Sequence, residues 1–586
     1  TDKEFKLAVD IETRARMIAC LGIGWSKHDA ICIPFMCAEK PEGYWTKTEE
    51  AKIIILLRAV LTHPNARGIG QNWQYDYQYI AKYFGFEVNL WLDTMTEHHT
   101  QWPGLPKGLD FISSLYKEHH IYWKEESKDW KKGLPEDTLW VYNCRDCVTT
   151  YECAEVLIAN RAVMPLRSTV YGTPYDIQQS LTTPIARASA RGVKKNHALV
   201  GQLVFELQEE IAKRQASLNA YIGREFNPRS PKQMQEFFYE ELGLQKIINW
   251  KTKKPTLNEE ALSRIGAGDI LLRPITSTIN LLRTLSNFLA VTQQATDGDG
   301  RIRCQYTIPG TETFRFNSTS DPFGYGGNLQ NVSTGERGEF EFYTLPNLRK
   351  LFIPDSGYTM GEFDLPQADA RVVAWESGDE ELMQLFADPT RSLHLENAEI
   401  LYGRKVRKDE PEYYNAKQGV HLTNYGGTSR VLSATLGITM KEADAFQTRW
   451  FAAHPKIAKW QERIKIQLMT KRYVENAFGY KRYYFERIEE LLKEALAWIP
   501  QSTVAIATNL LILKLDKDPE IQKRDIQLLL QTHDSTNFQW PSYQTEWIKA
   551  NYKTYMQIEV PYPTPLIFVP SMKYSDKSWG DCKEVK

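Results

Sequence analysis

Acidic residues at four places in the first part of the sequence have the types and spacing of a metal-binding group. Asp10 and Glu12 lie two residues apart in an alternating, strand-like pattern, so their side chains project from the same face. Asp76 stands at the start of a segment with a helical pattern. Tyr142 and Asp146 are four residues apart, which predicts that they share one face of one helix.

Four converging carboxylates can hold two divalent metal ions about 4 Å apart. Such ions activate a water molecule and stabilise the oxygen that leaves when a phosphodiester is cut. The hydroxyl of Tyr142 would orient the attacking water. We therefore predict a nuclease site with two divalent metal ions, whose ligands are Asp10, Glu12, Asp76 and Asp146; unrelated surface acids are the alternative.

A second acidic pair lies far along the chain. Asp364 ends an apolar strand in GEFDLPQADAR, and Asp534 follows His533 at the turn of a hairpin-like pattern, LLLQTHDSTNFQW. If these strands are neighbours, the two aspartates can share two Mg²⁺ ions. One ion would lower the pKa of a primer 3′-hydroxyl, and the other would clamp a triphosphate and the leaving pyrophosphate. The pair thus predicts a nucleotidyl-transfer site.

Three residues between these aspartates recur every four positions in AKQGVHLTNYGG: Lys417, His421 and Tyr425. This spacing predicts one face of a helix. On that face a lysine can neutralise a triphosphate, while the imidazole ring and the tyrosine flank the incoming base. We expect Lys417 to be both catalytic and nucleotide-binding.

The first group resembles the proofreading 3′→5′ exonuclease domain of DNA polymerases, in the version whose third motif is Tyr-x-x-x-Asp. The second resembles the family A DNA polymerases, which include bacterial DNA polymerase I and many phage replicases. The family motif Asp-x-x-Gln-x-Glu-x-Arg is matched from Asp364 to Arg371, and the fingers motif by Lys417, Tyr425 and Gly426. The motif His-Asp-Glu is matched by its first two residues.

The resemblance implies further site residues. Besides Lys417, the residues expected to bind the nucleotide are Gln367, Asp369, His394, His421 and Tyr425. For His394 a capping or packing role is the alternative. Those expected to contact DNA are Arg315, Gln330, Asn331, Gln501 and His533.

Five positions depart from the family pattern, and they cluster around the nascent base pair and triphosphate. Asp369 replaces the glutamate that acts as steric gate against a ribose 2′-hydroxyl, and His421 replaces an aromatic residue. Tyr413 stands where an arginine meets the triphosphate, Ala497 replaces a minor-groove asparagine, and Ser535 replaces a glutamate. We expect an active but divergent, phage-type enzyme whose pocket suits an unusual nucleotide or template.

The elements that position these residues follow from local patterns. The first part of the chain mixes β-branched runs with helical stretches at Thr48–Thr62 and Leu139–Arg161, which predicts an α/β domain. With the resemblance, the expected fold is a ribonuclease H-like α/β exonuclease domain followed by an α+β right-hand polymerase. The expected division is exonuclease 1–165, connector and start of the polymerase 166–199, thumb 200–296, palm 297–390, fingers 391–485 and palm again 486–586.

Composition adds weaker constraints. The chain carries 72 basic and 73 acidic residues, a balance that disfavours a protein that merely coats nucleic acid. Eight cysteines in 586 residues favour a reduced, cytoplasmic setting, in an infected bacterium if the protein is phage-encoded. We find no apolar run near the roughly 18 residues of a membrane span. The expected partners are primer-template DNA, dNTPs and replication accessory proteins, and the chain is expected to be a monomer.

Two alternatives remain open. The chain could be a 3′→5′ exonuclease whose impaired polymerase domain only holds DNA, which Tyr413 and Ser535 favour and the intact Asp364, Lys417 and Asp534 oppose. It could also be a non-catalytic DNA clamp, which the complete exonuclease group opposes.

Overall fold

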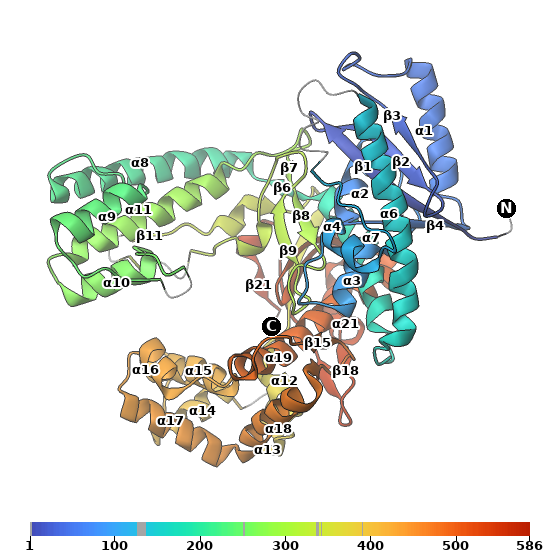
Figure 1. The fold of residues 1–586 in the computed structure, drawn as a ribbon. Coiled ribbons are helices and arrows are strands. Elements are labelled where there is room, and N and C mark those ends of the chain that lie inside the picture. Colours follow the sequence, from blue (N-terminus) through green and yellow to red (C-terminus); the bar gives the residue numbers. More distant parts are fainter. Residues whose placement is uncertain are drawn as a thin grey trace.

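The computed structural model describes residues 3–125, 136–249, 252–335, 339–340, 343–388 and 391–585. An N-terminal α/β domain lies at the upper right of Figure 1. A helical arm, α8 to α11, extends to the left from the middle of the molecule, and a second helical module, α13 to α17, lies below it. The C-terminal strands and helices join these parts at the centre.

The N-terminal domain is built on a five-stranded mixed sheet with the order β3-β2-β1-β4-β5. β1 pairs antiparallel with β2 and parallel with β4. The strands are β1 (Phe5–Arg14), β2 (Met17–Gly24), β3 (Ala30–Pro34), β4 (Ala66–Gly70) and β5 (Leu90–Asp93). The helices are α1 (Lys47–Leu61), α2 (Gln74–Tyr83), α3 (Thr94–Gln101), α4 (Leu109–Tyr116) and α6 (Glu136–Val163). α6 packs across β1, β2 and β3.

The central part is a five-stranded antiparallel sheet with the order β16-β17-β13-β20-β21. It unites segments that are more than 150 residues apart in the sequence, as the palm prediction required. Its strands are β13 (Tyr358–Asp364), β16 (Gln527–Thr532), β17 (Ser535–Pro541), β20 (Ser571–Ser575) and β21 (Lys583–Glu584). The helices around it are α12 (Ala368–Ser377), α19 (Ile488–Lys517), α20 (Pro519–Gln522) and α21 (Thr545–Tyr555).

The helical arm has an apolar core of its own, which includes Leu218, Phe238 and Leu282. Its helices are α8 (His197–Ile222), α9 (Pro231–Gln235), a π-helical turn (Glu236–Glu241), α10 (Glu259–Gly268) and α11 (Arg273–Thr292). The side chain of Ser230 caps α9, and proline opens that helix.

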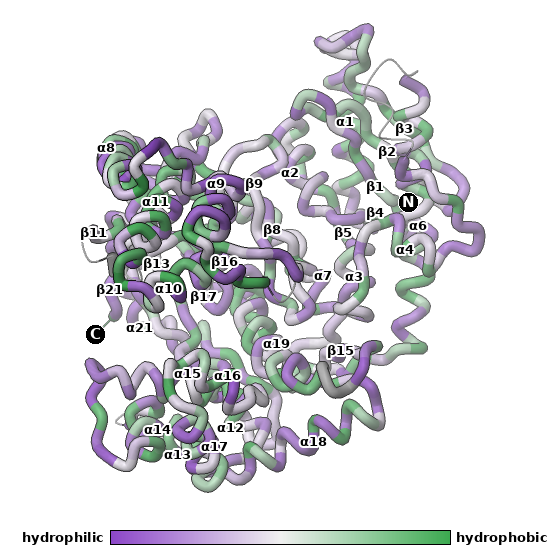
Figure 2. The backbone as a smooth tube through the Cα atoms, turned by 60° about the vertical axis from the view of Figure 1, so that its left-hand side comes forward, coloured by the Kyte–Doolittle hydropathy of each residue, from purple (hydrophilic) through white to green (hydrophobic). Residues whose placement is uncertain are grey.

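The lower module comprises α13 (Glu380–Ala387), α14 (Leu393–Tyr402), α15 (Pro411–Asn424), α16 (Ser429–Leu436) and α17 (Met440–Ala453). After it the chain returns to α19 through α18 (Pro455–Lys471), β14 (Tyr473–Glu475) and β15 (Lys481–Tyr483). Thr439 and Glu442 form a capping box at the start of α17. Green and purple alternate along α18 in Figure 2. Its buried residues, Ile457, Trp460 and Ile464 among them, recur at helical spacing, so one face packs inward.

The 18-residue helix α7 (Pro174–Arg191) packs against α2, α3 and α19. The remaining elements are short: β6 (Val193–Lys195), β7 (Arg301–Ile302), β8 (Cys304–Thr307), β9 (Asn317–Ser320), β10 (Glu339–Phe340), β11 (Tyr343–Thr344), β12 (Phe352–Ile353), β18 (Ile558–Val560), β19 (Leu566–Phe568) and single 3₁₀ turns including Leu329–Asn331. The predicted fold class, an α/β domain followed by an α+β part, is confirmed. The residue boundaries of the domains stay predictions.

One helical segment among the described residues is long and apolar enough to cross a membrane, namely Leu491–Lys517 of α19, with a hydropathy of 1.5. Of its most apolar stretch, 89% is buried inside the protein. Such burial is typical of a core helix, so length and composition are weak evidence for a membrane span here.

Candidate functional site

Three of the four predicted nuclease acids converge. Asp10 and Glu12 project from one face of β1, and Asp146 comes from α6, which packs on that strand. One carboxylate oxygen from each of these three residues lies within 4.8 Å of the other two. This spacing suits a shared divalent ion, whose oxygen ligands surround it at about 2.0–2.6 Å.

The fourth acid, Asp76, lies at the start of α2 and is buried. Its Oδ1 accepts a hydrogen bond from the backbone N–H of Ile11 at 3.0 Å, so Asp76 is tied to β1 at the residue between Asp10 and Glu12. The negative charge of Asp76 is also one of the causes that raise the pKa of Asp10.

Neighbouring side chains hold the third acid tightly. Lys124 donates to Oδ2 of Asp146 at 2.6 Å and to the hydroxyl of Tyr142 at 2.9 Å. The indole N–H of Trp123 donates to Oδ1 of Asp146 at 2.6 Å. Tyr142 therefore lies beside the acidic group, where the sequence places the residue that orients water.

Crowding of buried carboxylates shifts their acidity. Burial, and then the charges of Asp146 and Asp76, raise the pKa of Asp10 well above its ordinary value. Burial, followed by Asp146, raises the pKa of Glu12 to about 7. Burial likewise raises the pKa of Asp146, although Lys124 opposes the shift. Such a cluster gains stability from an added positive charge.

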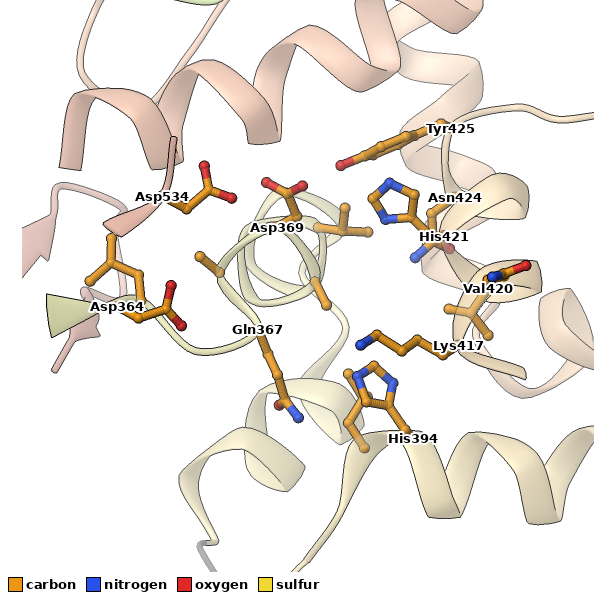
Figure 3. A pocket seen from close by; sticks show the side chains of 16 residues that line it. Asp364, Gln367, Asp369, His394, Lys417, Val420, His421, Asn424, Tyr425 and Asp534 are labelled. Carbon is orange, nitrogen blue, oxygen red and sulfur yellow. The ribbon is translucent and has the colours of Figure 1, made fainter. Parts of the chain in front are cut away.

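The second pair of acids meets at one end of the central sheet. Asp364 is the last residue of β13 and is the Cα partner of Ser535, the first residue of β17. Asp534 immediately precedes Ser535 in the β16–β17 turn, so both aspartates point into one cavity (Figure 3). Burial, and then the charges of Glu362 and Asp534, raise the pKa of Asp364 to about 6.

Arg315 and Glu362 contact the residues of this turn. Arg315 Nη2 donates to Oδ1 of Asp534 at 2.8 Å, so a predicted DNA-binding arginine is paired with a predicted metal ligand. Ser535 Oγ donates to Oε1 of Glu362 at 3.2 Å. Glu362 precedes Asp364 by two residues on β13 and thus places a third carboxylate beside the pair.

The opposite wall of the cavity is α15. Lys417, His421 and Tyr425 lie along one side of this helix and its C-terminal cap, and they face the aspartates across a volume of about 450 Å³ (Figure 3). Lys417 is the one lysine or arginine among the described residues that line this cavity.

His394 lies next to Lys417 at the start of α14. Burial, and then the charge of Lys417, lower the pKa of His394 to about 4, so its ring is neutral near pH 7. Its ring also contacts Tyr413 edge-on, with centroids 6.0 Å apart. His394, predicted to lie at the triphosphate, thus lines the cavity, and its ring also packs against Tyr413.

Asp369 and Gln367 lie between the two walls. Asp369 points toward Asp534 and Tyr425, and burial followed by the charge of Asp534 raises its pKa to about 6 (Figure 3). Gln367 is the N-cap residue just before α12 and has the left-handed backbone angle φ 56°. A non-glycine residue in this conformation is under strain, which accumulates at functional sites.

The predicted DNA contacts gather around the β16–β17 turn. Asn331 Oδ1 lies 3.2 Å from Nε2 of His533, and Gln330 Nε2 donates to Gln531 Oε1 at 2.8 Å. His533 also has a left-handed backbone, with φ 55°. Gln501 lies apart from these contacts, partly exposed on α19 after Pro500.

Comparison with known proteins agrees with this geometry. Residues 197–581 match the model for DNA polymerase family A, and residues 2–158 match that for a 3′-5′ exonuclease. This chain belongs to DNA polymerase family A. It is 29% identical over 405 residues to the thermostable DNA polymerase I of Thermus filiformis, covering 67% of this chain and 46% of that protein.

A second relative of this family A chain is DNA polymerase I of Pseudomonas aeruginosa, 23% identical over 556 residues, which covers 90% of this chain and 58% of the relative. The chain thus spans about half the length of the curated relatives it matches. The polymerase domain of Pol1 from M. smegmatis, solved with DNA primer-template and dNTP, has the same fold, with a TM-score of 0.77 and 19% identity over 98% of this chain and 96% of that one.

Sequence reasoning missed Lys124 at the exonuclease site and Glu362 at the polymerase site. It named Arg315 as a DNA contact but did not foresee its pairing with Asp534. Glu362 had a usable signal, because it stands two residues from Asp364 in a strand, as Asp10 does from Glu12. No sequence pattern indicated the contacts of Lys124, since they depend on a loop that meets α6 only in the folded chain.

Proposed function

We propose that this chain is a DNA-dependent DNA polymerase with a 3′→5′ proofreading exonuclease. The observation that carries the proposal is the meeting of Asp364 and Asp534 at one end of the sheet, opposite Lys417 on α15. The acidic group of Asp10, Glu12 and Asp146 supports the second activity.

Both acidic sites suit divalent metal ions, and we propose Mg²⁺, two at each site. The support lies in the donor sets, which are carboxylate oxygens with raised pKa values that favour an added cation. When bound, such ions lower the pKa of an attacking hydroxyl or water and stabilise the leaving oxygen.

At the polymerase site, the side chains would position the nucleotide. Lys417 would pair with the triphosphate, and the rings of His421 and Tyr425 would flank the incoming base. The ring centroids of these two residues are 4.3 Å apart, so they form one continuous wall. Arg315, His533 and the amides of the Leu329–Asn331 turn would contact the primer-template near Asp534.

At the exonuclease site, Asp10, Glu12, Asp76 and Asp146 would hold the ions, and the Tyr142 hydroxyl would orient the attacking water. Asn143 donates to Oδ2 of Asp10 at 2.8 Å and so fixes one acid. The two sites lie in separate parts of the chain, so a primer end would move between them for proofreading.

The wider context belongs to the same proposal. We propose a phage replicative enzyme that acts as a monomer in the bacterial cytoplasm, with replication accessory proteins as partners. Eight free cysteines fit a reduced compartment. Departures from the family at Asp369 and His421, both in the cavity, support a preference for an unusual nucleotide or template. Single-nucleotide insertion with ordinary and modified dNTPs tests this preference, and equal rates would remove it.

A primer-extension gel tests the main proposal. A labelled primer on a longer template should lengthen with dNTPs and Mg²⁺ and shorten with Mg²⁺ alone. Shortening under both conditions would favour an exonuclease with an impaired polymerase domain. Neither lengthening nor shortening, with the DNA bound, would favour a DNA clamp.

A further inference from the structure

Lys124 makes two close contacts inside the acidic group of the N-terminal domain. Its Nζ lies 2.6 Å from Oδ2 of Asp146 and 2.9 Å from the hydroxyl of Tyr142. Its side chain is 26% exposed and that of Asp146 is 6% exposed, so the ion pair is largely shielded from water. Water screens the attraction in such a pair less than in a surface ion pair.

The adjacent residue completes this arrangement. Trp123 is buried, and its indole N–H donates to the other oxygen of Asp146 at 2.6 Å. Both oxygens of one acid are therefore bound by two consecutive residues of the segment that precedes α6. The side chain of Lys124 also lies over the rings of Trp123 and Tyr142, with centroid distances of 5.4 and 5.0 Å, which fixes its direction.

We propose that Lys124 is a positioning residue of the exonuclease site: its ammonium is a resident cation that fixes Asp146 and Tyr142 and competes with a divalent ion for Asp146. The inference rests on the proposed exonuclease function. The inference assigns to Lys124 the orientation of the Tyr142 hydroxyl, which accepts a hydrogen bond from its Nζ.

Competition follows from charge and distance. A divalent ion bound by Asp146 would lie about 2.0–2.6 Å from a carboxylate oxygen. The ammonium, 2.6 Å from Oδ2, would then be a few ångströms from that ion, and like charges at such a distance repel. Metal binding therefore requires the ammonium to withdraw from Asp146.

The tyrosine contact gives the lysine a role after withdrawal. Tyr142 lies one helical turn before Asp146 on α6, so an ammonium that leaves the acid can stay bonded to the hydroxyl. A hydroxyl that accepts from Lys124 keeps its own proton free to bond a water oxygen. Lys124 would thus hold the tyrosine in the orientation that the attacking water needs.

The test is Mn²⁺ binding, measured by the loss of the free Mn²⁺ electron paramagnetic resonance signal. The full chain carries Asp364→Ala and Asp534→Ala, so that the polymerase site does not contribute to Mn²⁺ binding. In this background Lys124→Met should bind Mn²⁺ about tenfold more tightly, within the usual range of coupling between two sites. Lys124→Arg, which keeps the charge, should restore an affinity near that of the background.

Thermal unfolding supplies a second readout. Without metal, Lys124→Met should unfold at a lower temperature than the background, because buried acids lose their counter-ion. Saturating Mn²⁺ should close this gap, since a ligand stabilises more strongly the variant that binds it more tightly. The exonuclease kcat of Lys124→Met should fall with little change in the KM for primer. Lys124→Arg should recover part of the lost kcat.

Two results would overturn the inference: an unchanged Mn²⁺ affinity in Lys124→Met, or a stability loss of the same size with and without Mn²⁺. A variant too unstable to purify without metal is replaced by Lys124→Gln, for which the same results are decisive. Failure of the proposed exonuclease itself would look different. In that case the background chain would lack nuclease activity, and Asp10→Ala with Glu12→Ala would leave Mn²⁺ binding unchanged.

Discussion

Asp364 and Ser535 are Cα partners on the neighbouring strands β13 and β17. Because Asp534 precedes Ser535 in the tight β16–β17 turn, this register brings two aspartates together that are far apart in sequence. A shift of one residue would turn Asp364 to the other face of the sheet and separate the pair. The proposed polymerase site therefore depends on strand register.

Replacing Ser535 by glutamate, the residue of the family motif, should not improve this enzyme. Ser535 Oγ donates to Glu362, so a carboxylate at position 535 would meet a like charge in a buried place. We expect Ser535→Glu to lower the free energy of unfolding by about 1–3 kcal/mol, without faster nucleotide incorporation. Chemical denaturation and single-nucleotide incorporation measure the two effects.

The matched control is Ser535→Glu combined with Glu362→Gln, which removes the repulsion and should recover most of the stability. Faster incorporation by Ser535→Glu alone would show instead that the serine limits the chemistry.

As the pH is lowered, the exonuclease site should lose divalent-ion affinity before the polymerase site does. Divalent ions bind deprotonated carboxylates, and the pKa is raised to about 7 for Glu12 and to about 6 for Asp364. Mn²⁺ affinity should therefore fall with decreasing pH at both sites, and at a higher pH in the exonuclease site. Titrations from about pH 8 to about pH 5.5 in Asp364→Ala/Asp534→Ala and in Asp10→Ala/Glu12→Ala chains separate the two sites.

The same shifts set the sign of a stability effect. A raised carboxyl pKa means that the folded, metal-free chain holds its proton more tightly than the unfolded chain does. These groups therefore make the free energy of unfolding fall as pH rises from about 4, their unfolded value, to about 7. Asp10→Asn/Glu12→Gln should flatten this slope in metal-free protein, and an unchanged slope would contradict the assignment.

Loss of Lys417 should weaken the use of dNTPs. Its ammonium lines the cavity opposite Asp364, and a charge-assisted contact to phosphate is worth about 1.5–3 kcal/mol. We expect Lys417→Ala to lower kcat/KM for dNTP by about 10- to 100-fold, and Lys417→Arg to lose less. Lys408→Ala, an exposed lysine before α15, is the control. Equal losses in the two alanine variants would argue against a triphosphate contact.

Gly361 of β13 packs closely against Trp540 beneath the polymerase site, which predicts an effect on stability. A Cβ on Gly361 of β13 would lie 2.2 Å from the ring of the buried Trp540. Gly361→Ala should therefore lower the free energy of unfolding by about 1–3 kcal/mol, seen as a lower thermal midpoint. Gly201→Ala on α8, where nothing lies within 4 Å, should raise it by up to about 1 kcal/mol. Equal midpoints for these variants would contradict the packing.

The sequence predicted most of the fold because the decisive signals are local. Alternation predicted β1, apolar runs meeting at a polar turn predicted the β16–β17 hairpin, and four-residue spacing predicted the face of α15 that carries Lys417. Each signal follows from backbone geometry within a few residues.

What the sequence could not supply depends on contacts between distant segments. Lys124 meets Asp146 only because a loop folds back on α6, and Arg315 meets Asp534 across 219 residues. Charge alone does not single out these two cations among 72 basic residues. Local patterns therefore identified the acids of both sites except Glu362, but not the contacts that Lys124 and Arg315 make with them.

The central claim is most directly tested by primer extension and degradation in paired variants of the full chain. Asp534→Ala should abolish extension and leave Mg²⁺-dependent shortening of the primer intact, while Asp10→Ala with Glu12→Ala should abolish shortening and leave extension intact. Continued extension by Asp534→Ala would contradict the account, because two aspartates that meet at the end of β13 would then not be the site of synthesis.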